Sequence, residues 1–331
     1  DDTMPVEVKL KAFNPLIPGN ADDSGIPIFI LKYEVKNKTK QMLEVSVCGS
    51  MNNFIGSYGY QKNQKNLYKE NNGLSGIYMF NEGLADTLES WGTIALTTPE
   101  KTNTSYRTSI STSMMPWDLR DIWTDFAEDG ELTEKEYKSG DVRRASLSVK
   151  HQIAPGQSRD FTFYITWHFP NRKAWADKVV GNYYTTQYHD AWDVIEKTHP
   201  RIQELEDKTL TFVNAFIDSD LPEVVKEAAL FNLSTLRSET CFRTQDGMFF
   251  GWEGTFDRHG VGTGSCTHVW SYEQTTPFFF GELAKYQRII ELKHATDDNG
   301  LMSFRVSLPL EKANNYKKAA ADGQMGAISK L

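Results

Sequence analysis

The sequence predicts a mixed fold, in which an antiparallel β-sandwich is followed by a helical domain. Two observations support this prediction. Up to Pro170, the chain consists of short apolar-rich segments of strand length separated by turn-forming residues, which is typical of a sandwich. After Pro170, apolar residues recur at helical spacing. We therefore expect a β-sandwich domain over residues 1–172 and a helical domain over residues 173–331.

The strands are predicted from alternation and from turns. Residues 6–11 alternate apolar and charged side chains, as a half-buried strand does. Residues 28–35 and 43–47 flank a polar turn at 37–40, and we interpret them as a hairpin. The same interpretation applies to two later runs joined by an Ala-Pro-Gly-Gln turn, at residues 145–153 and 161–167. Further short strands are expected at residues 76–80 and 92–96.

The stretch over residues 117–140 is acidic and irregular, and we interpret it as a long loop or short helix inserted between strands. In the second half of the chain, Asp220 and Pro222 are typical of a helix cap and a first helical turn. Four helical stretches are predicted there, at residues 188–216 with an interruption near Pro200, at 223–238, at 271–295 and at 312–330. The last stretch has no stop signal, so we expect the sequence to be a piece of a longer protein.

Composition excludes several classes of function. The 331 residues include 36 Lys and Arg against 44 Asp and Glu, and the net charge of −8 argues against a nucleic acid or an anionic membrane surface as partner. No apolar run approaches the ~20 residues of a transmembrane helix. The 3 cysteines include no C-x-x-C pair, so we predict neither a metal site nor a cofactor. Both a cytoplasmic and an extracytoplasmic (periplasmic or secreted) location remain open.

The segment over residues 246–274 is the richest in chemistry. It combines closely spaced glycines, which allow close backbone approach, with aromatic side chains, carboxylates and imidazoles. This composition is typical of a loop that lines a binding pocket. Within it, Glu253 stands between Trp252 and Gly254, and a carboxylate beside an indole has its reactivity set by its neighbours.

Other kinds of site in this segment are less well supported. Cys266 and His268 lack the further ligands of a zinc site. A Cys–His nucleophile pair is not expected either, because side chains two residues apart on an extended segment seldom meet at hydrogen-bond distance. Residues 260–264, with the sequence GVGTG, lack the glycine spacing and the lysine of a nucleotide-binding loop.

Two motifs in this segment resemble glycoside hydrolase family 116, which includes β-glucosidases and the non-lysosomal glucosylceramidase. They are FFGWEG at residues 249–254 and GSCTHVWSY at residues 264–272. Supporting stretches lie at residues 13–18, 22–27 and 320–326. The resemblance covers essentially the whole chain, in the domain order of the family.

The resemblance implies a β-sandwich followed by an (α/α)6 barrel, of which this chain would hold the first part, and retaining hydrolysis of β-linked glycosides. Glu253 falls at the position of the catalytic nucleophile of the family. His268 falls roughly where the family places a sugar-binding aspartate. The acid/base aspartate of the family would lie outside this chain, and a family histidine expected near residues 305–310 has no counterpart here.

The remaining site candidates are residues suited to bind a sugar. Trp252 and Trp270 are candidate walls for a sugar ring. Candidates for hydroxyl recognition are Arg243, Asp246, Asp257, Arg258 and His259, together with Arg305, Asp322 and Gln324 in later loops. The expected partners are a carbohydrate or glycoside substrate and the remainder of the catalytic domain.

Two alternative functions remain open. One is a non-catalytic glycan-binding relative that keeps the pocket without the activity. The other is an (α/α)6 glycoside phosphorylase, against which a Glu nucleophile argues, because inverting chemistry holds its carboxylates farther apart.

Overall fold

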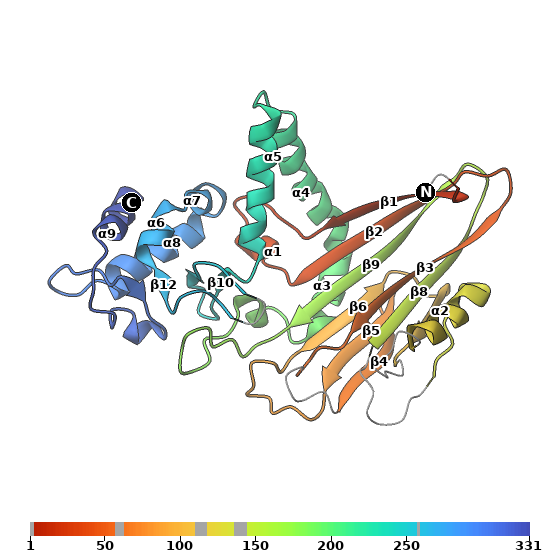
Figure 1. Cartoon of the computed structure of the whole chain (residues 1–331), viewed down its shortest axis with the longest axis horizontal. Helices are drawn as coiled ribbons and strands as arrows, with labels where there is room; N and C mark the ends of the chain where they lie inside the picture. The colour runs from red at the N-terminus through yellow and green to blue at the C-terminus, as the bar shows by residue number, and fades with distance from the viewer. Residues whose placement is uncertain (1–2, 57–62, 110–117, 136–143, 257–258) are drawn as a thin grey trace. The chain divides into compact units, whose positions relative to one another are not determined.

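The computed structural model describes residues 3–56, 63–109, 118–135, 144–256 and 259–331. The chain forms two compact units, each assembled from separate stretches of sequence (Figure 1). The β-rich unit comprises residues 1–14, 27–169 and 188–201, and the helical unit comprises residues 15–26, 170–187 and 202–331. The predicted mixed class, antiparallel sheets first and helices afterwards, is confirmed.

The described residues of the β-rich unit form two antiparallel sheets. The larger has the strand order β1-β2-β9-β6-β5-β4 and the smaller the order β3-β8-β7. The strands are β1 (Val6–Phe13), β2 (Ile28–Asn37), β3 (Leu43–Asn52), β4 (Gln64–Asn71), β5 (Leu74–Asn81), β6 (Thr93–Thr98), β7 (Thr104–Arg107), β8 (Arg144–Ile153) and β9 (Ser158–His168). Of these, β4 and β7 were not predicted, because both are rich in polar residues.

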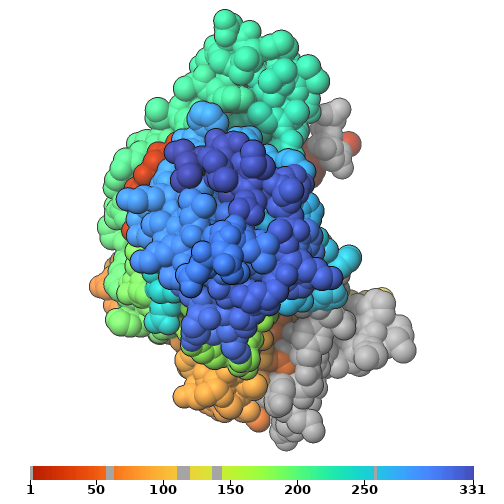
Figure 2. Space-filling model, turned by 90° about the vertical axis from the view of Figure 1, so that its left-hand side faces the viewer, coloured from red at the N-terminus to blue at the C-terminus, as the bar shows by residue number. Residues whose placement is uncertain are grey.

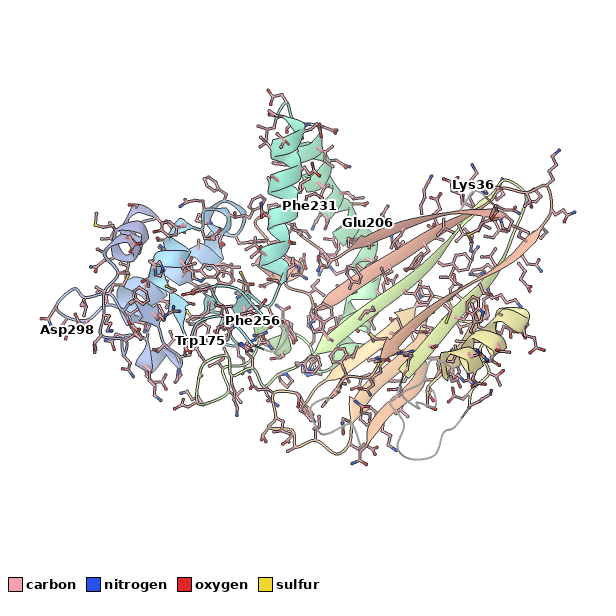
Figure 3. All side chains as sticks on the ribbon, in the orientation of Figure 1. Lys36, Trp175, Glu206, Phe231, Phe256 and Asp298 are labelled. Carbon is pink, nitrogen blue, oxygen red and sulfur yellow. The ribbon has the colours of Figure 1, made fainter. Side chains whose placement is uncertain are left out.

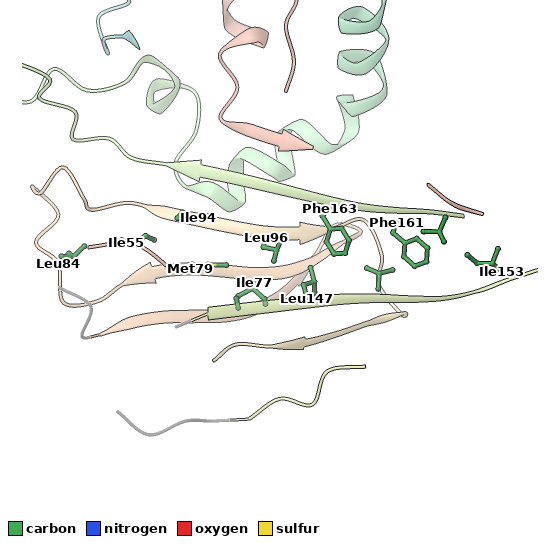
Figure 4. Close-up of a cluster of buried hydrophobic side chains, with 13 residues drawn as sticks. Ile55, Ile77, Met79, Leu84, Ile94, Leu96, Leu147, Ile153, Phe161 and Phe163 are labelled. Carbon is green, nitrogen blue, oxygen red and sulfur yellow. The ribbon is translucent and has the colours of Figure 1, made fainter. Parts of the chain in front are cut away.

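The core of this unit lies between the two sheets. Ile77 and Met79 of β5 and Phe161 and Phe163 of β9 come from the larger sheet, and Leu147 of β8 from the smaller one (Figure 4). All five side chains are buried. Burial of this cluster provides the main stabilisation of the unit.

The prediction of two hairpins is wrong. β2 pairs with β1 and β9, whereas β3 pairs with β8, so each predicted hairpin joins strands of opposite sheets. The reason lies in Asn37, whose buried side chain donates to the carbonyls of Gln41 (2.7 Å) and Ile153 (2.9 Å). These bonds hold both connections together at one end of the sandwich, where the chain crosses from sheet to sheet. Turn chemistry alone does not distinguish this crossing from a hairpin.

Two α-helices accompany the sheets in the described part of this unit. The stretch predicted as a long loop or short helix contains α2 (Asp118–Asp129), and its residues 117 and 136–140 lie outside the described residues. The fully buried Arg107 binds Asp121 of this helix at 2.7 Å. The second helix, α3 (Ala191–Thr198), begins at Asp190, whose carboxylate accepts from the backbone N–H groups of Trp192 and Asp193.

The helical unit contains shorter elements than the sequence predicted. Its helices are α1 (Ala21–Ser24), α4 (Ile202–Ile217), α5 (Glu223–Asn232), α6 (Thr267–Tyr272), α7 (Thr275–Phe279), α8 (Gly281–Ile289) and α9 (Ala321–Ser329), and its strands are β10 (Cys241–Arg243), β11 (Phe249–Gly251), β12 (Ser265–Cys266) and β13 (Arg305–Val306). The predicted interruption near Pro200 is confirmed, since a 3-10 turn separates α3 from α4. None of the helices that the structure describes is long and apolar enough to cross a membrane.

The stretch predicted as one helix over residues 271–295 is instead divided among α6, α7, α8 and a π-helical turn over residues 290–294. Helix α6 ends at Glu273, whose backbone is extended and whose carboxylate accepts from the N–H of Thr276 (2.6 Å). A new helix therefore begins at residue 275, with Pro277 in its first turn, where the absence of an N–H costs little.

Helices α6 and α9 pack closely together. A Cβ at Gly323 would lie 2.7 Å from the backbone N of His268, and one at Gly326 would lie 2.3 Å from the Cβ of Ser271. Lys330 donates to the carbonyl of Trp270 (2.7 Å), which satisfies a terminal carbonyl of α6. Figure 2 shows this C-terminal segment in dark blue, beside the lighter blue of the residues that precede it.

Candidate active site

The backbone around Glu253 is fixed by two neighbouring hydrogen-bonded pairs. Strand β11 pairs with β10, and the N–H of Trp252 then donates to the carbonyl of Thr240 (2.8 Å). The chain turns back beyond this point, because the N–H of Glu253 donates to the carbonyl of Val261 (3.2 Å) and the N–H of Val261 to the carbonyl of Gly254 (2.8 Å). Glu253 thus begins a hairpin whose described residues, 253–256 and 259–261, are paired by backbone hydrogen bonds.

The carboxylate of Glu253 faces a cation. Its Oε1 lies 2.5 Å from Nη2 of Arg305, and the two side chains are only 23% and 19% exposed. Arg305 approaches from β13, which pairs with β12 so that Arg305 lies opposite Cys266. Glycine is required beside this pair, since a Cβ at Gly262 would lie 2.5 Å from Nη1 of Arg305, and Gly262 has a φ of +72°.

Cys266 and His268 lie in contact, which corrects the expectation that they would not meet. Cys266 Sγ is 2.7 Å from Nδ1 of His268. The reason is that Cys266 ends β12 and His268 lies in the first turn of α6. The chain therefore changes direction between them, and the side chains converge. Burial raises the pKa of the Cys266 thiol, and the nearby carboxylate of Glu253 also raises that pKa.

His268 also connects this group to α9. Its ring stacks on Phe304 with centroids 4.9 Å apart, and a Cβ at Gly323 of α9 would lie 2.7 Å from its backbone N. The pKa of Asp322, also in α9, is lowered chiefly by the hydroxyl of Tyr272, which donates to its Oδ2 at 2.8 Å. Tyr272 was not singled out from the sequence, although its spacing of four residues from His268 on a helix was a readable signal.

The structure therefore brings together Glu253, Arg305, His268 and Asp322 of the predicted site residues, with Cys266 and Tyr272 added. Because these groups come from the hairpin, β12, β13, α6 and α9, their meeting depends on tertiary structure. The arrangement offers one carboxylate beside a guanidinium, one imidazole and a second carboxylate. Such groups can bind hydroxyls and stabilise positive charge at a sugar carbon.

The two predicted indole walls pack within the helical unit. Trp270 is 6% exposed, donates its indole N–H to the carbonyl of Gly251 (3.2 Å) and meets Phe249 edge-on. Trp252 packs edge-on against Trp175, labelled in Figure 3, with ring centroids 4.7 Å apart. Their role as sugar walls stays a prediction.

The other candidates lie elsewhere or serve the local fold. Asp257 and Arg258 lie outside the described residues. His259 is exposed at the end of the hairpin, with its ring 5.0 Å from that of Phe256 (Figure 3 labels Phe256). Gln324 donates to the carbonyl of Gly300 (2.8 Å).

Two further candidates hold the turn between β10 and β11. Asp246 accepts from the hydroxyl of Thr244 (2.5 Å) and from the N–H of Met248 (3.2 Å). Arg243 binds Asp22 of α1 at 2.6 Å and donates from Nε to the carbonyl of Gly247 (3.1 Å). Both side chains thus stabilise local structure.

In the part of the chain that the structure describes, no group of three or more His, Cys, Asp or Glu side chains could hold a metal ion.

An antiparallel sandwich followed by helices, with a largely buried glutamate paired with an arginine, is an arrangement suited to a carbohydrate-active protein. A family model described as "beta-glucosidase 2, glycosyl-hydrolase family 116 N-term" matches residues 1–205. The chain belongs to glycosyl-hydrolase family 116, and the resemblance noted in its sequence is confirmed.

The chain was also compared with curated proteins and with solved structures. No curated protein matches the chain. Among solved structures, one described as "Putative kojibiose phosphorylase from human microbiome" matches with 10% sequence identity and a TM-score of 0.30. The match covers 99% of this chain and 39% of that one, so the chain spans about two fifths of the length of that structure.

Proposed function

We propose that the protein is a retaining glycoside hydrolase that cleaves β-linked glycosides, as a β-glucosidase or glucosylceramidase does, with Glu253 as its nucleophile. The observation that carries this proposal is the position of Glu253, whose carboxylate is held by Arg305 at 2.5 Å on an ordered hairpin. A nucleophilic carboxylate must be held in one orientation, and a guanidinium that pairs with it can fix that orientation.

The mechanism requires a second carboxyl group about 5–5.5 Å from the first, which protonates the leaving oxygen and later activates water. We assign that role to an aspartate outside this chain, as the family resemblance implies. We further propose that residues 173–331 form the first part of an (α/α)6 barrel. In this proposal His268, Arg305 and Asp322 contact the sugar, together with Asp257, His259, Gln324, Trp252 and Trp270.

The test uses the full-length protein and an aryl β-glucoside. Replacing the nucleophile, in Glu253→Gln, should lower kcat/KM by a factor of at least about 10³, or about 4 kcal/mol of transition-state stabilisation. Glu227→Gln is the matched control, because Glu227 is an exposed glutamate of α5 in the same unit. The activity of this variant should equal that of the unaltered protein. A 2-fluoro glycoside should label Glu253 covalently.

The outcomes separate the candidate functions. Unchanged turnover in Glu253→Gln would contradict the nucleophile assignment. Glycan binding without turnover in the unaltered full-length protein would favour the non-catalytic relative. Cleavage that depends on phosphate and proceeds without labelling would favour the phosphorylase.

A further inference from the structure

Lys330 is a buried cation at the C-terminal end of α9, and the proposed reaction does not use it. Its side chain is only 6% exposed. The ammonium donates to the carbonyl of Trp270 (2.7 Å) and also to that of Glu273, so it satisfies carbonyls at the C-terminal end of α6. The carboxylate of Glu273 lies 4.0 Å from the same ammonium. These contacts tie the end of α9 to the end of α6.

Other charged groups face this ammonium from the elements around it. Arg288 belongs to α8, and Glu291 belongs to the π-helical turn that follows α8. Nη2 of Arg288 lies 2.8 Å from Oε2 of Glu291, and its Nη1 donates to the carbonyl of Ala327 in α9 (3.4 Å). Burial lowers the pKa of Lys330, whereas the carboxylates of Glu273 and Glu291 act in the opposite direction. Two buried cations therefore hold this end of α9.

The opposite end of α9 carries Asp322, whose Oδ2 accepts from the hydroxyl of Tyr272 in the candidate site at 2.8 Å. Between the two ends, Gly323 and Gly326 face α6, and together with Lys330 they occupy positions i, i+3 and i+7 of one helix face. A glycine has no side chain to fit into a groove of the neighbouring helix, so these two positions bring the helices close without locking one against the other. The contacts at its two ends therefore set the position of α9 along α6.

We propose that Lys330 is a positioning residue, which fixes α9 along α6 and thereby holds Asp322 beside Tyr272 in the candidate site. A shift of α9 by one residue would move Asp322 by about 1.5 Å, which is enough to break a hydrogen bond of 2.8 Å. The inference rests on the proposed function for its effect on turnover, because it is in that proposal that Asp322 contacts the sugar. The position of Asp322 itself does not depend on that function.

The first experiment follows the hydroxyl of Tyr272 in the full-length protein and needs no turnover. The hydrogen bond to Asp322 raises the pKa of this hydroxyl. NMR with ¹³Cζ-labelled tyrosine measures that pKa, and Tyr272→Phe assigns the signal. In Lys330→Met, which removes the ammonium but keeps a side chain of similar length, the pKa should fall towards the ordinary value of about 10. In Lys330→Arg, which keeps a cationic donor, it should stay raised.

Lys226→Met is the matched control. Lys226 is also buried in the helical unit, and its ammonium donates to the carbonyl of Ile217, the last residue of α4 (2.6 Å). Both methionine variants lose a buried lysine that satisfies a helix carbonyl, so the midpoint of thermal unfolding should fall in both. Only Lys330→Met should change the pKa of Tyr272. An unchanged pKa in Lys330→Met, an equal change in Lys226→Met, or an ordinary pKa in the unaltered protein would overturn the inference.

The second experiment measures KM and kcat with an aryl β-glucoside. A group that contacts the sugar equally in the ground state and the transition state affects KM rather than kcat, so Lys330→Met should raise KM about three- to tenfold and keep kcat within about twofold. The double variant Lys330→Met/Asp322→Asn should have the KM of Asp322→Asn alone, because both changes act through one contact. Effects on KM that multiply in the double variant would overturn the inference. If no β-glycoside is cleaved but the pKa of Tyr272 behaves as expected, the proposed function fails and the positioning role stands.

Discussion

The contact between Gly251 and Trp270 gives a sharp test of how the site is supported. A Cβ on Gly251 would lie 1.7 Å from Cζ2 of Trp270, whereas carbon atoms in contact are about 3.5–4.0 Å apart. The indole therefore has to move by about 2 Å. It cannot do so freely, because it is 6% exposed, meets Phe249 edge-on and donates to the carbonyl of Gly251 itself.

We therefore expect Gly251→Ala to lower the free energy of unfolding by about 3 kcal/mol, at the upper end of the usual cost of overpacking. The assay is denaturant unfolding followed by tryptophan fluorescence. Gly281→Ala is the matched control, since no atom lies within 4 Å of a Cβ at this exposed first residue of α8. It should leave stability unchanged or raise it by about 0.4–1 kcal/mol.

A second substitution identifies the cause. Trp270→Phe removes Cζ2 and the neighbouring ring atoms, so the double variant Gly251→Ala/Trp270→Phe should be more stable than the sum of the single effects predicts, by about 1–3 kcal/mol. A stability of Gly251→Ala within about 0.5 kcal/mol of the unaltered protein, or fully additive effects in the double variant, would refute the reasoning.

Three further predictions concern other contacts. Arg305→Met should lower the free energy of unfolding by about 1–3 kcal/mol, because it leaves a largely buried carboxylate unpaired; the double variant with Glu253→Gln should recover part of that loss in the same denaturant assay. Burial raises the pKa of Glu291 to about 7, so this carboxyl group keeps a proton in the folded state at pH values where the unfolded state has released it. The free energy of unfolding should therefore fall by on the order of 1–3 kcal/mol as pH rises from about 5 to 7.5. Urea titrations of Glu291→Gln should lack this decline. Asn37→Ala should cost about 2–4 kcal/mol, because it leaves the buried carbonyl of Ile153 and other groups unbonded; equal stability in thermal and urea unfolding would contradict the role assigned to this side chain.

Much of the fold is readable from local sequence, but the pairing of strands is not. Alternation located β1, and the turn residues located the ends of β2 and β3. Which strands become neighbours depends instead on long-range contacts such as that of Asn37 with Ile153, which no local pattern encodes. Strand β4 escaped detection for a related reason, since its buried positions include Gln64 and Asn66, whose amide N–H groups donate hydrogen bonds to backbone carbonyls.

The candidate site shows the same division. The glycine- and aromatic-rich composition directed attention to the segment that contains Glu253 and His268, whose roles in a sugar site stay a prediction. Their partners came from elsewhere, since Arg305 reaches Glu253 through the pairing of β12 with β13. The contact of Cys266 with His268 was missed because it depends on a change from strand to helix between the two residues. Spacing rules assume one kind of secondary structure throughout, and they fail at such a junction.

The close contact of α6 with α9 has an evolutionary consequence. Because a Cβ at Gly326 would overlap Ser271, the two positions share one small volume. A larger side chain at one position must therefore be matched by a smaller one at the other. Related chains should therefore show correlated substitutions here, with a larger residue at 326 accompanied by glycine at 271. Position 323 should stay glycine in them, because its neighbour is the main chain of His268, which no compensating replacement can shrink.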